Sequence, residues 1–114
     1  MPLLSIDTNV ALEKDKADIL IRSASSLLAN MLGKPESYVM VKYEHNPYML
    51  FAGNDAPLIY AEIKSLGLPE ERTREFSEKL TDFFQKETGV AADRVYIEFA
   101  SPARHMWGWN SSTF

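Results

Sequence analysis

The most distinctive chemical group in this sequence is the proline at position 2, which directly follows Met1. Aminopeptidases remove a methionine that precedes a small residue, and its removal would leave Pro2 with a free secondary amine. An α-amino group has a pKa of about 7.7–8.0, and burial lowers this pKa because desolvation disfavours the charged form. A secondary amine is somewhat more basic, so it needs a strongly apolar environment to be neutral near physiological pH. A base of this kind is well suited to proton transfer at carbon.

Apolar and cationic side chains elsewhere in the chain can make Pro2 a catalytic base, provided that folding brings them together. The apolar candidates are Leu3, Tyr96, Trp107, Trp109 and Phe114. Lys34 would lower the pKa of the amine further and would hold an anionic substrate. Taken singly, each feature has a simpler interpretation: Pro2 begins a strand, Lys34 complements a helix C-terminus, and the aromatic residues fill a core or an interface. Taken together, they predict an isomerase of carbon acids that uses no metal and no cofactor.

Composition excludes several other kinds of site. The chain has no cysteine, which rules out disulfides, thiolate nucleophiles and cysteine zinc sites. Its two histidines, His45 and His105, lack the acidic spacing of a metal site or a catalytic triad. The net charge is −4 with both signs interspersed, so we expect no nucleic-acid partner. No apolar run approaches the roughly 20 residues that span a bilayer and no signal sequence is recognisable, so we expect no membrane contact and a cytoplasmic location.

The elements that must position these residues fall into two similar halves. An extended segment (2–7), a helical stretch and a strand pattern (33–44) are followed by a second extended segment (57–63), a helical stretch and a strand pattern (89–100). Pro2 and Pro57 are 55 residues apart, and Gly33 and Gly89 are 56 residues apart. A repeated offset of this kind indicates a duplicated β-α-β unit. We therefore interpret residues 1–114 as a single domain with pseudo-repeat halves of about 2–56 and 57–114.

Hydrophobic spacing predicts one helix in each half. The first helix has apolar residues at helical spacing, namely Leu20, Ala24, Leu27, Leu28 and Met31. The second begins at Glu70 and Glu71, after Pro69, and its apolar positions are Phe76, Leu80, Phe83 and Phe84. Two such units predict an α+β fold in which a mixed four-stranded sheet carries both helices on one face. The other face lacks a cover, so we expect oligomerisation through the sheet, with short strands in 48–53 and 106–110 at its edges or paired with neighbouring subunits.

Six segments of the chain resemble the macrophage migration inhibitory factor family, within the tautomerase superfamily. They are the initial Met-Pro, DTNV (7–10), GKPESYVMV (33–41), SLG (65–67), DRVYIEF (93–99) and GWNSSTF (108–114). The resemblance implies a homotrimer, in which three sheets form a barrel around a central channel and the active sites lie at subunit interfaces. It also implies keto–enol tautomerase activity on phenylpyruvate-like α-keto acids. The family's Cys-x-x-Cys motif is missing at 58–61, as in a bacterial-type homologue, so we expect no thiol oxidoreductase activity.

The resemblance also implies roles for individual residues. Pro2 takes the position of the family's catalytic N-terminal proline, and Lys34 that of the lysine that contacts the substrate carboxylate. Ser65 and Leu66 take the positions that line the pocket from the same subunit, with Leu66 replacing an isoleucine. Four further pocket positions are implied to come from an adjacent subunit: Tyr96, Trp107, Trp109 and Phe114.

Two departures from the mammalian pattern bear on substrate choice. Glu98 stands in place of an asparagine that contacts the distal end of the substrate, and a carboxylate there would discourage anionic or oxygen-rich ends. Trp107 replaces a small aliphatic residue and would narrow the mouth of the pocket.

Two other functions remain open at this level. The same proline could serve a hydratase or a dehalogenase on unsaturated acids, but such enzymes need arginines in the pocket, and Arg104 is the only nearby candidate. The chain could instead be a trimeric interaction or signalling protein with a relic site, although the receptor-contacting loops of the family are not recognisable in it.

Overall fold

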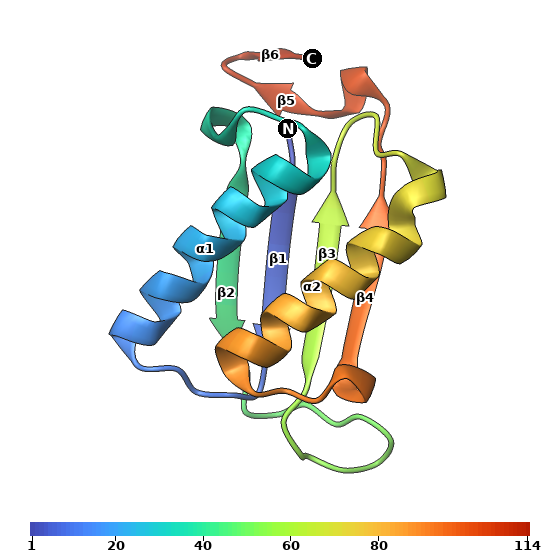
Figure 1. Ribbon diagram of the computed structural model, residues 1–114. Coiled ribbons are helices and arrows are strands. Elements are labelled where there is room, and N and C mark those ends of the chain that lie inside the picture. Colours follow the sequence, from blue (N-terminus) through green and yellow to red (C-terminus); the bar gives the residue numbers. More distant parts are fainter.

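Four strands form one mixed sheet in the computed structural model, which describes residues 1–114 throughout (Figure 1). The strands are β1 (Leu3–Thr8), β2 (Met40–His45), β3 (Ile59–Lys64) and β4 (Val95–Ala100). They lie in the order β2-β1-β3-β4. The pairs β1–β2 and β3–β4 are parallel, and the central pair β1–β3 is antiparallel. The predicted α+β fold with a mixed four-stranded sheet is therefore confirmed.

Both long helices, α1 (Lys14–Leu32) and α2 (Thr73–Thr88), lie on the same face of this sheet (Figure 1). Each helix connects two parallel strands, so the chain contains the duplicated β-α-β unit that the repeat predicts. The second helix begins at Thr73, later than expected, because Glu70–Arg72 form a separate 3-10 turn. Helix α1 ends at Gly33, whose φ of 63° is left-handed and which closes the last turn.

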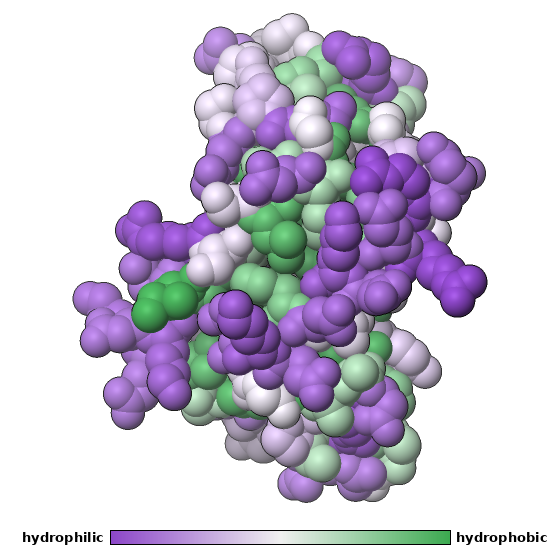
Figure 2. Space-filling view, viewed as in Figure 1, coloured by the Kyte–Doolittle hydropathy of each residue, from purple (hydrophilic) through white to green (hydrophobic).

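The hydrophobic core fills the space between the helices and the sheet. Alternate residues of β3, namely Ile59, Ala61 and Ile63, are fully buried, and the facing helix residues are buried as well: Leu20, Ala24, Leu28, Phe76, Leu80 and Phe84. Figure 2 shows hydrophobic side chains between the two helices and hydrophilic side chains over their outer surfaces. Burial of apolar area is the main force that holds this layer together. Neither helix is both long and apolar enough to span a bilayer.

The opposite face of the sheet is not covered by any helix. It presents the other set of alternating side chains, among them Tyr60, Glu62 and Lys64 of β3. The hydroxyl of Tyr60 contacts carboxylate oxygens of Glu62 at 3.0 Å and of Glu98, on β4, at 2.7 Å. These two carboxylates raise the pKa of Tyr60 well above its ordinary value, mainly through the hydrogen bond with Glu98. The exposed face is thus polar and rich in charged groups.

The segment 48–53 does not add a strand to the sheet, although the sequence pattern allows one. It forms a turn closed by a single bridge between Phe51 and Asn54. The guanidinium of Arg94 holds this turn, because it donates hydrogen bonds to the carbonyl oxygens of Phe51 at 2.7 Å and of Ala56 at 2.8 Å. The same guanidinium lies 5.1 Å from the centre of the Phe51 ring. In 106–110 the chain forms β5 (Gly108–Trp109), which pairs only with β6 (Ser112–Thr113).

Candidate active site

Pro2 lies fully buried at the end of the sheet where β1 begins. Its carbonyl oxygen accepts a 3.0 Å hydrogen bond from the backbone N–H of Met40, the first residue of β2. The next residue, Leu3, lies opposite Met40 on one side and opposite Lys64 on the other. Strand pairing therefore fixes the position of Pro2 from both neighbouring strands.

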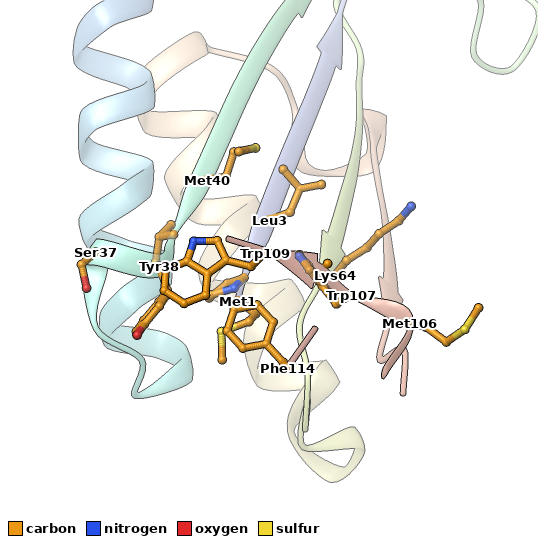
Figure 3. A pocket seen from close by; sticks show the side chains of 13 residues that line it. Met1, Leu3, Ser37, Tyr38, Met40, Lys64, Met106, Trp107, Trp109 and Phe114 are labelled. Atoms are coloured by element: carbon orange, nitrogen blue, oxygen red, sulfur yellow. The ribbon is translucent and has the colours of Figure 1, made fainter. Parts of the chain in front are cut away.

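A cavity of about 590 Å³ surrounds this end of β1. Segments that are distant in sequence form its wall: the chain start, the 3-10 turn Glu36–Tyr38 with the start of β2, the end of β3, and the C-terminal segment. The lining is mostly hydrophobic and consists of Met1, Pro2, Leu3, Ser37, Tyr38, Val39, Met40, Lys64, Met106, Trp107, Gly108, Trp109 and Phe114. Figure 3 shows how these side chains meet. The volume is suited to a small organic molecule.

Three aromatic rings form one wall of the cavity. The rings of Trp109 and Phe114 are stacked, with centroids 5.4 Å apart and planes at 9°. The Tyr38 ring meets both edge-on, with centroid distances of 5.5 Å to Trp109 and 6.1 Å to Phe114. Figure 3 shows the three rings gathered around Met1. Such a wall can hold a planar apolar group beside the start of the chain.

The C-terminal hairpin brings two of these rings into place. Its turn contains Asn110 and Ser111, both with positive φ, as a tight two-residue hairpin turn requires. The hairpin returns the last residue toward the first, and the N–H of Phe114 donates a 3.2 Å hydrogen bond to the carbonyl oxygen of Trp107. Both chain termini therefore lie at the same end of the sheet (Figure 1).

The electrostatic character of the cavity favours a neutral amine and an anionic ligand. Burial lowers the pKa of the chain-terminal amine, which in the structure belongs to Met1, and the positive charge of Lys34 lowers this pKa further. Lys64 is the only charged side chain in the lining, which contains no Asp or Glu residue. The structure contains no cluster of three or more His, Cys, Asp or Glu side chains placed to hold a metal ion.

Five of the residues singled out from the sequence meet in this cavity: Pro2, Leu3, Trp107, Trp109 and Phe114. The resemblance implies that the last three come from an adjacent subunit. In the structure they lie in the same cavity as Pro2 of their own chain, because the hairpin of β5 and β6 folds over the end of the sheet where β1 begins.

Lys34, Ser65 and Leu66 lie close to this end of the sheet but do not line the cavity. Lys34 follows the helix-ending Gly33 and acts on the terminal amine through its charge. Ser65 and Leu66 are buried directly after β3, where the N–H of Ser65 donates a 3.0 Å hydrogen bond to the carbonyl oxygen of Ala100.

Tyr96 and Glu98 lie on the uncovered face of β4, outside the cavity of their own chain. The ring of Tyr96 is 64% exposed and packs against Phe51 at a centroid distance of 4.6 Å. Glu98 is held by the Tyr60 hydroxyl. Arg104, the residue on which the hydratase or dehalogenase alternative depends, is also absent from the lining.

The sequence reasoning missed Tyr38, Met40 and Lys64 as cavity residues. Tyr38 lies in a 3-10 turn that does not follow the alternation of the strand after it. Lys64 extends the expected strand 57–63 by one residue, and pairing that strand with 2–7 in antiparallel register would have placed it opposite Leu3. The missing information was the register between strands.

Comparisons with known proteins agree with this fold. The whole chain, residues 1–114, matches the family model described as macrophage migration inhibitory factor (MIF). A macrophage migration inhibitory factor homolog from Trichuris trichiura is 39% identical over 115 aligned residues, which cover 100% of both chains. The crystal structure of a homologue from Prochlorococcus marinus is 42% identical, with a TM-score of 0.92 and 98% of each chain covered. The structure of the factor from Trichinella spiralis is 30% identical, with a TM-score of 0.90, and covers 98% of this chain and 99% of that one.

Proposed function

The chain belongs to the macrophage migration inhibitory factor family, and on that premise we propose that it is a keto–enol tautomerase of phenylpyruvate-like α-keto acids. In this proposal Met1 is removed and the amine of Pro2 is the catalytic base and acid. The reaction uses only groups of the chain itself. The observation that carries the proposal is the burial of Pro2 in a mostly hydrophobic cavity where the pKa of the chain-terminal amine is lowered.

The proposed reaction moves one proton between carbon and oxygen. The neutral Pro2 nitrogen removes the hydroxyl proton of the enol while the C2=O bond forms, and the electron pair of the C2=C3 bond takes a proton at C3. In the reverse direction the nitrogen removes a C3 proton, the C2=C3 bond forms, and the oxygen is protonated. A lowered pKa supports this role because it leaves the amine neutral at the pH where it must accept a proton. One well-placed base contributes about 10²–10⁴-fold in rate.

The remaining residues position the substrate in this proposal. Lys34 binds the carboxylate next to the carbonyl, close to the amine that its charge influences. The rings of Trp109 and Phe114 hold the aryl group, and Trp107 narrows the cavity mouth. Ser65 and Leu66, buried directly after Lys64, support this end of β3.

We propose further that the protein is a homotrimer with its active sites at subunit interfaces. The uncovered face of the sheet supports this arrangement, because it leaves Tyr96 and Glu98 outside the cavity of their own chain and free to reach that of an adjacent subunit. Sedimentation equilibrium tests it: a mass of three chains is expected, and a monomer at assay concentration contradicts it.

The base is tested by changing the chain start. Intact mass spectrometry first establishes whether Met1 is removed, and the ultraviolet signal of phenylpyruvate enol then reports turnover. We expect Pro2→Ala to lower kcat/KM by about 10²-fold or more, and one additional residue before Pro2 to abolish turnover. Pro69→Ala, far along the chain in the turn before α2, is the matched control and should retain activity. Equal rates in all four proteins would exclude the Pro2 amine as the base.

A further inference from the structure

Lys64 is the only charged side chain that lines the cavity, and the proposed reaction gives it no role. We propose that Lys64 is a specificity-determining residue that binds a second carboxylate of the substrate. The site then prefers 2-oxo acids that carry an acidic group at the end remote from the keto carboxylate. This inference rests on the proposed function for the identity of the reacting group, and it names the substrate class of that site.

The position of Lys64 separates its charge from the aromatic wall. It is the last residue of β3 and lies opposite Leu3, one residue from Pro2. Figure 3 shows its side chain extending away from the rings of Tyr38 and Phe114. A ligand whose keto carboxylate lies beside the chain-terminal amine, on the side of Lys34, thus meets a second cation, Lys64, in the cavity itself.

The charges around Lys64 leave its ammonium group available. Its one ion pair in the structure, with Glu62, is long at 3.7 Å between Nζ and Oε2, and its side chain remains 48% exposed. An exposed pair of this kind contributes little. The other oxygen of Glu62 contacts the Tyr60 hydroxyl at 3.0 Å, and the same hydroxyl lies 2.7 Å from Glu98. Both carboxylates are therefore engaged by Tyr60 on the open face, and neither lines the cavity.

An ammonium group with three donors and one weak partner gains a charge-assisted hydrogen bond from an incoming carboxylate. A substrate with a single carboxylate leaves Lys64 hydrated, so its binding affinity does not depend on Lys64. Because Lys64 is half exposed, the preference for the dianion is modest, about fivefold in affinity. Nine of the thirteen lining residues are hydrophobic, which suits the hydrocarbon chain between two carboxylates.

The test compares 2-oxohexanoate with 2-oxoadipate, which have the same six-carbon chain and differ by the second carboxylate. Binding is followed by tryptophan fluorescence, since the chain has only two tryptophans and both line the cavity. Turnover is followed separately as exchange of the C3 protons for deuterium by NMR. The variants are Lys64→Met, Lys64→Arg, which retains the charge, and the control Lys79→Met on α2.

We expect the wild type to bind 2-oxoadipate about fivefold more tightly than 2-oxohexanoate. Lys64→Met should abolish this preference by weakening only the binding of 2-oxoadipate, whereas Lys64→Arg and Lys79→Met should keep it. Equal affinity of the wild type for the two acids, or a preference that survives in Lys64→Met, overturns the inference. If the wild type prefers 2-oxoadipate but catalyses no C3 exchange, the proposed reaction is refuted and the role of Lys64 is supported. If C3 exchange occurs but the two acids bind with equal affinity, the proposed reaction is supported and the role of Lys64 is refuted.

Discussion

The backbone N–H of Met40 donates a 3.0 Å hydrogen bond to the carbonyl oxygen of Pro2, and this bond joins the first residue of β2 to the residue before β1. It holds Pro2 through its carbonyl group alone, and proline has no N–H to contribute to a sheet. The nitrogen that the proposed reaction needs is consequently not part of the strand pairing. The end of the sheet thus positions Pro2 while leaving its nitrogen free of strand hydrogen bonds.

Removal of the charge of Lys34 should raise the pKa of the chain-terminal amine. Burial is the larger cause of the lowered pKa and remains in Lys34→Met, so the pKa should rise but stay below that of an unburied chain-terminal amine. NMR titration of the amine measures it directly, and the lower limb of the pH–rate profile should move toward higher pH with it. Lys16→Met, at the exposed start of α1, is the matched control. An amine pKa that is the same in Lys34→Met and wild type would contradict the role of this charge.

Asp7 should make stability depend on pH in the direction opposite to an ordinary carboxylate. It lies opposite Glu44 in the pairing of β1 with β2. Burial is the larger cause that raises its pKa above 3.8, and the neighbouring Glu44 is the second. The folded chain therefore holds this proton more tightly than the unfolded chain, and the stabilisation is lost as the pH rises through the raised pKa. In urea unfolding, the stability of Asp7→Asn relative to wild type should increase as the pH rises through the raised pKa of Asp7. That of Asp82→Asn, exposed on α2, should not, and the same pH dependence in both variants would exclude this origin.

The layer between α1 and the sheet should carry much of the stability. Leu28 is fully buried in the core, and Leu28→Ala should lower the free energy of unfolding by about 2–5 kcal/mol, through lost burial and the cavity that remains. Ile19 on the same helix is 54% exposed, and Ile19→Ala should change the free energy of unfolding by less than about 1 kcal/mol. Urea unfolding at one fixed protein concentration measures both, because assembly makes stability depend on concentration. Equal losses in the two variants would contradict the burial assigned to this helix.

Arg94 should protect the turn 51–56 from local opening. Its guanidinium donates to the carbonyl oxygens of Phe51 and Ala56 and stacks over the Phe51 ring, so Arg94→Met removes every one of these contacts. We expect chymotrypsin to cleave after Phe51 several times faster in this variant, since cleavage requires the turn to open. Arg22→Met, which loses only an exposed ion pair with Asp18 on α1, is the control. Cleavage at an unchanged rate would show that Arg94 does not restrain the turn.

Much of the fold was predictable because its signals are local. The spacing of Leu20, Ala24 and Leu28 is periodic within one helix, and the repeated offset between Gly33 and Gly89 reveals the second β-α-β unit. The prediction was less good where local and tertiary preferences compete. Residues 48–53 have the composition of a strand, but the Arg94 contacts hold them in a turn.

Hydrophobic periodicity, turn residues and the Met-Pro start are visible within a few residues, so they predict the helices, the strands and the candidate base, and the repeated offset adds the mixed sheet. Which side chains share the cavity with that base depends on how these elements pack. The tertiary structure placed Trp109 and Phe114 beside Pro2 of the same chain, and it added Tyr38 and Lys64. These residues are separated by tens of positions, and their meeting depends on strand register and on the direction of the C-terminal hairpin. Register is set by pairing between distant segments, so a pattern within one segment does not contain it.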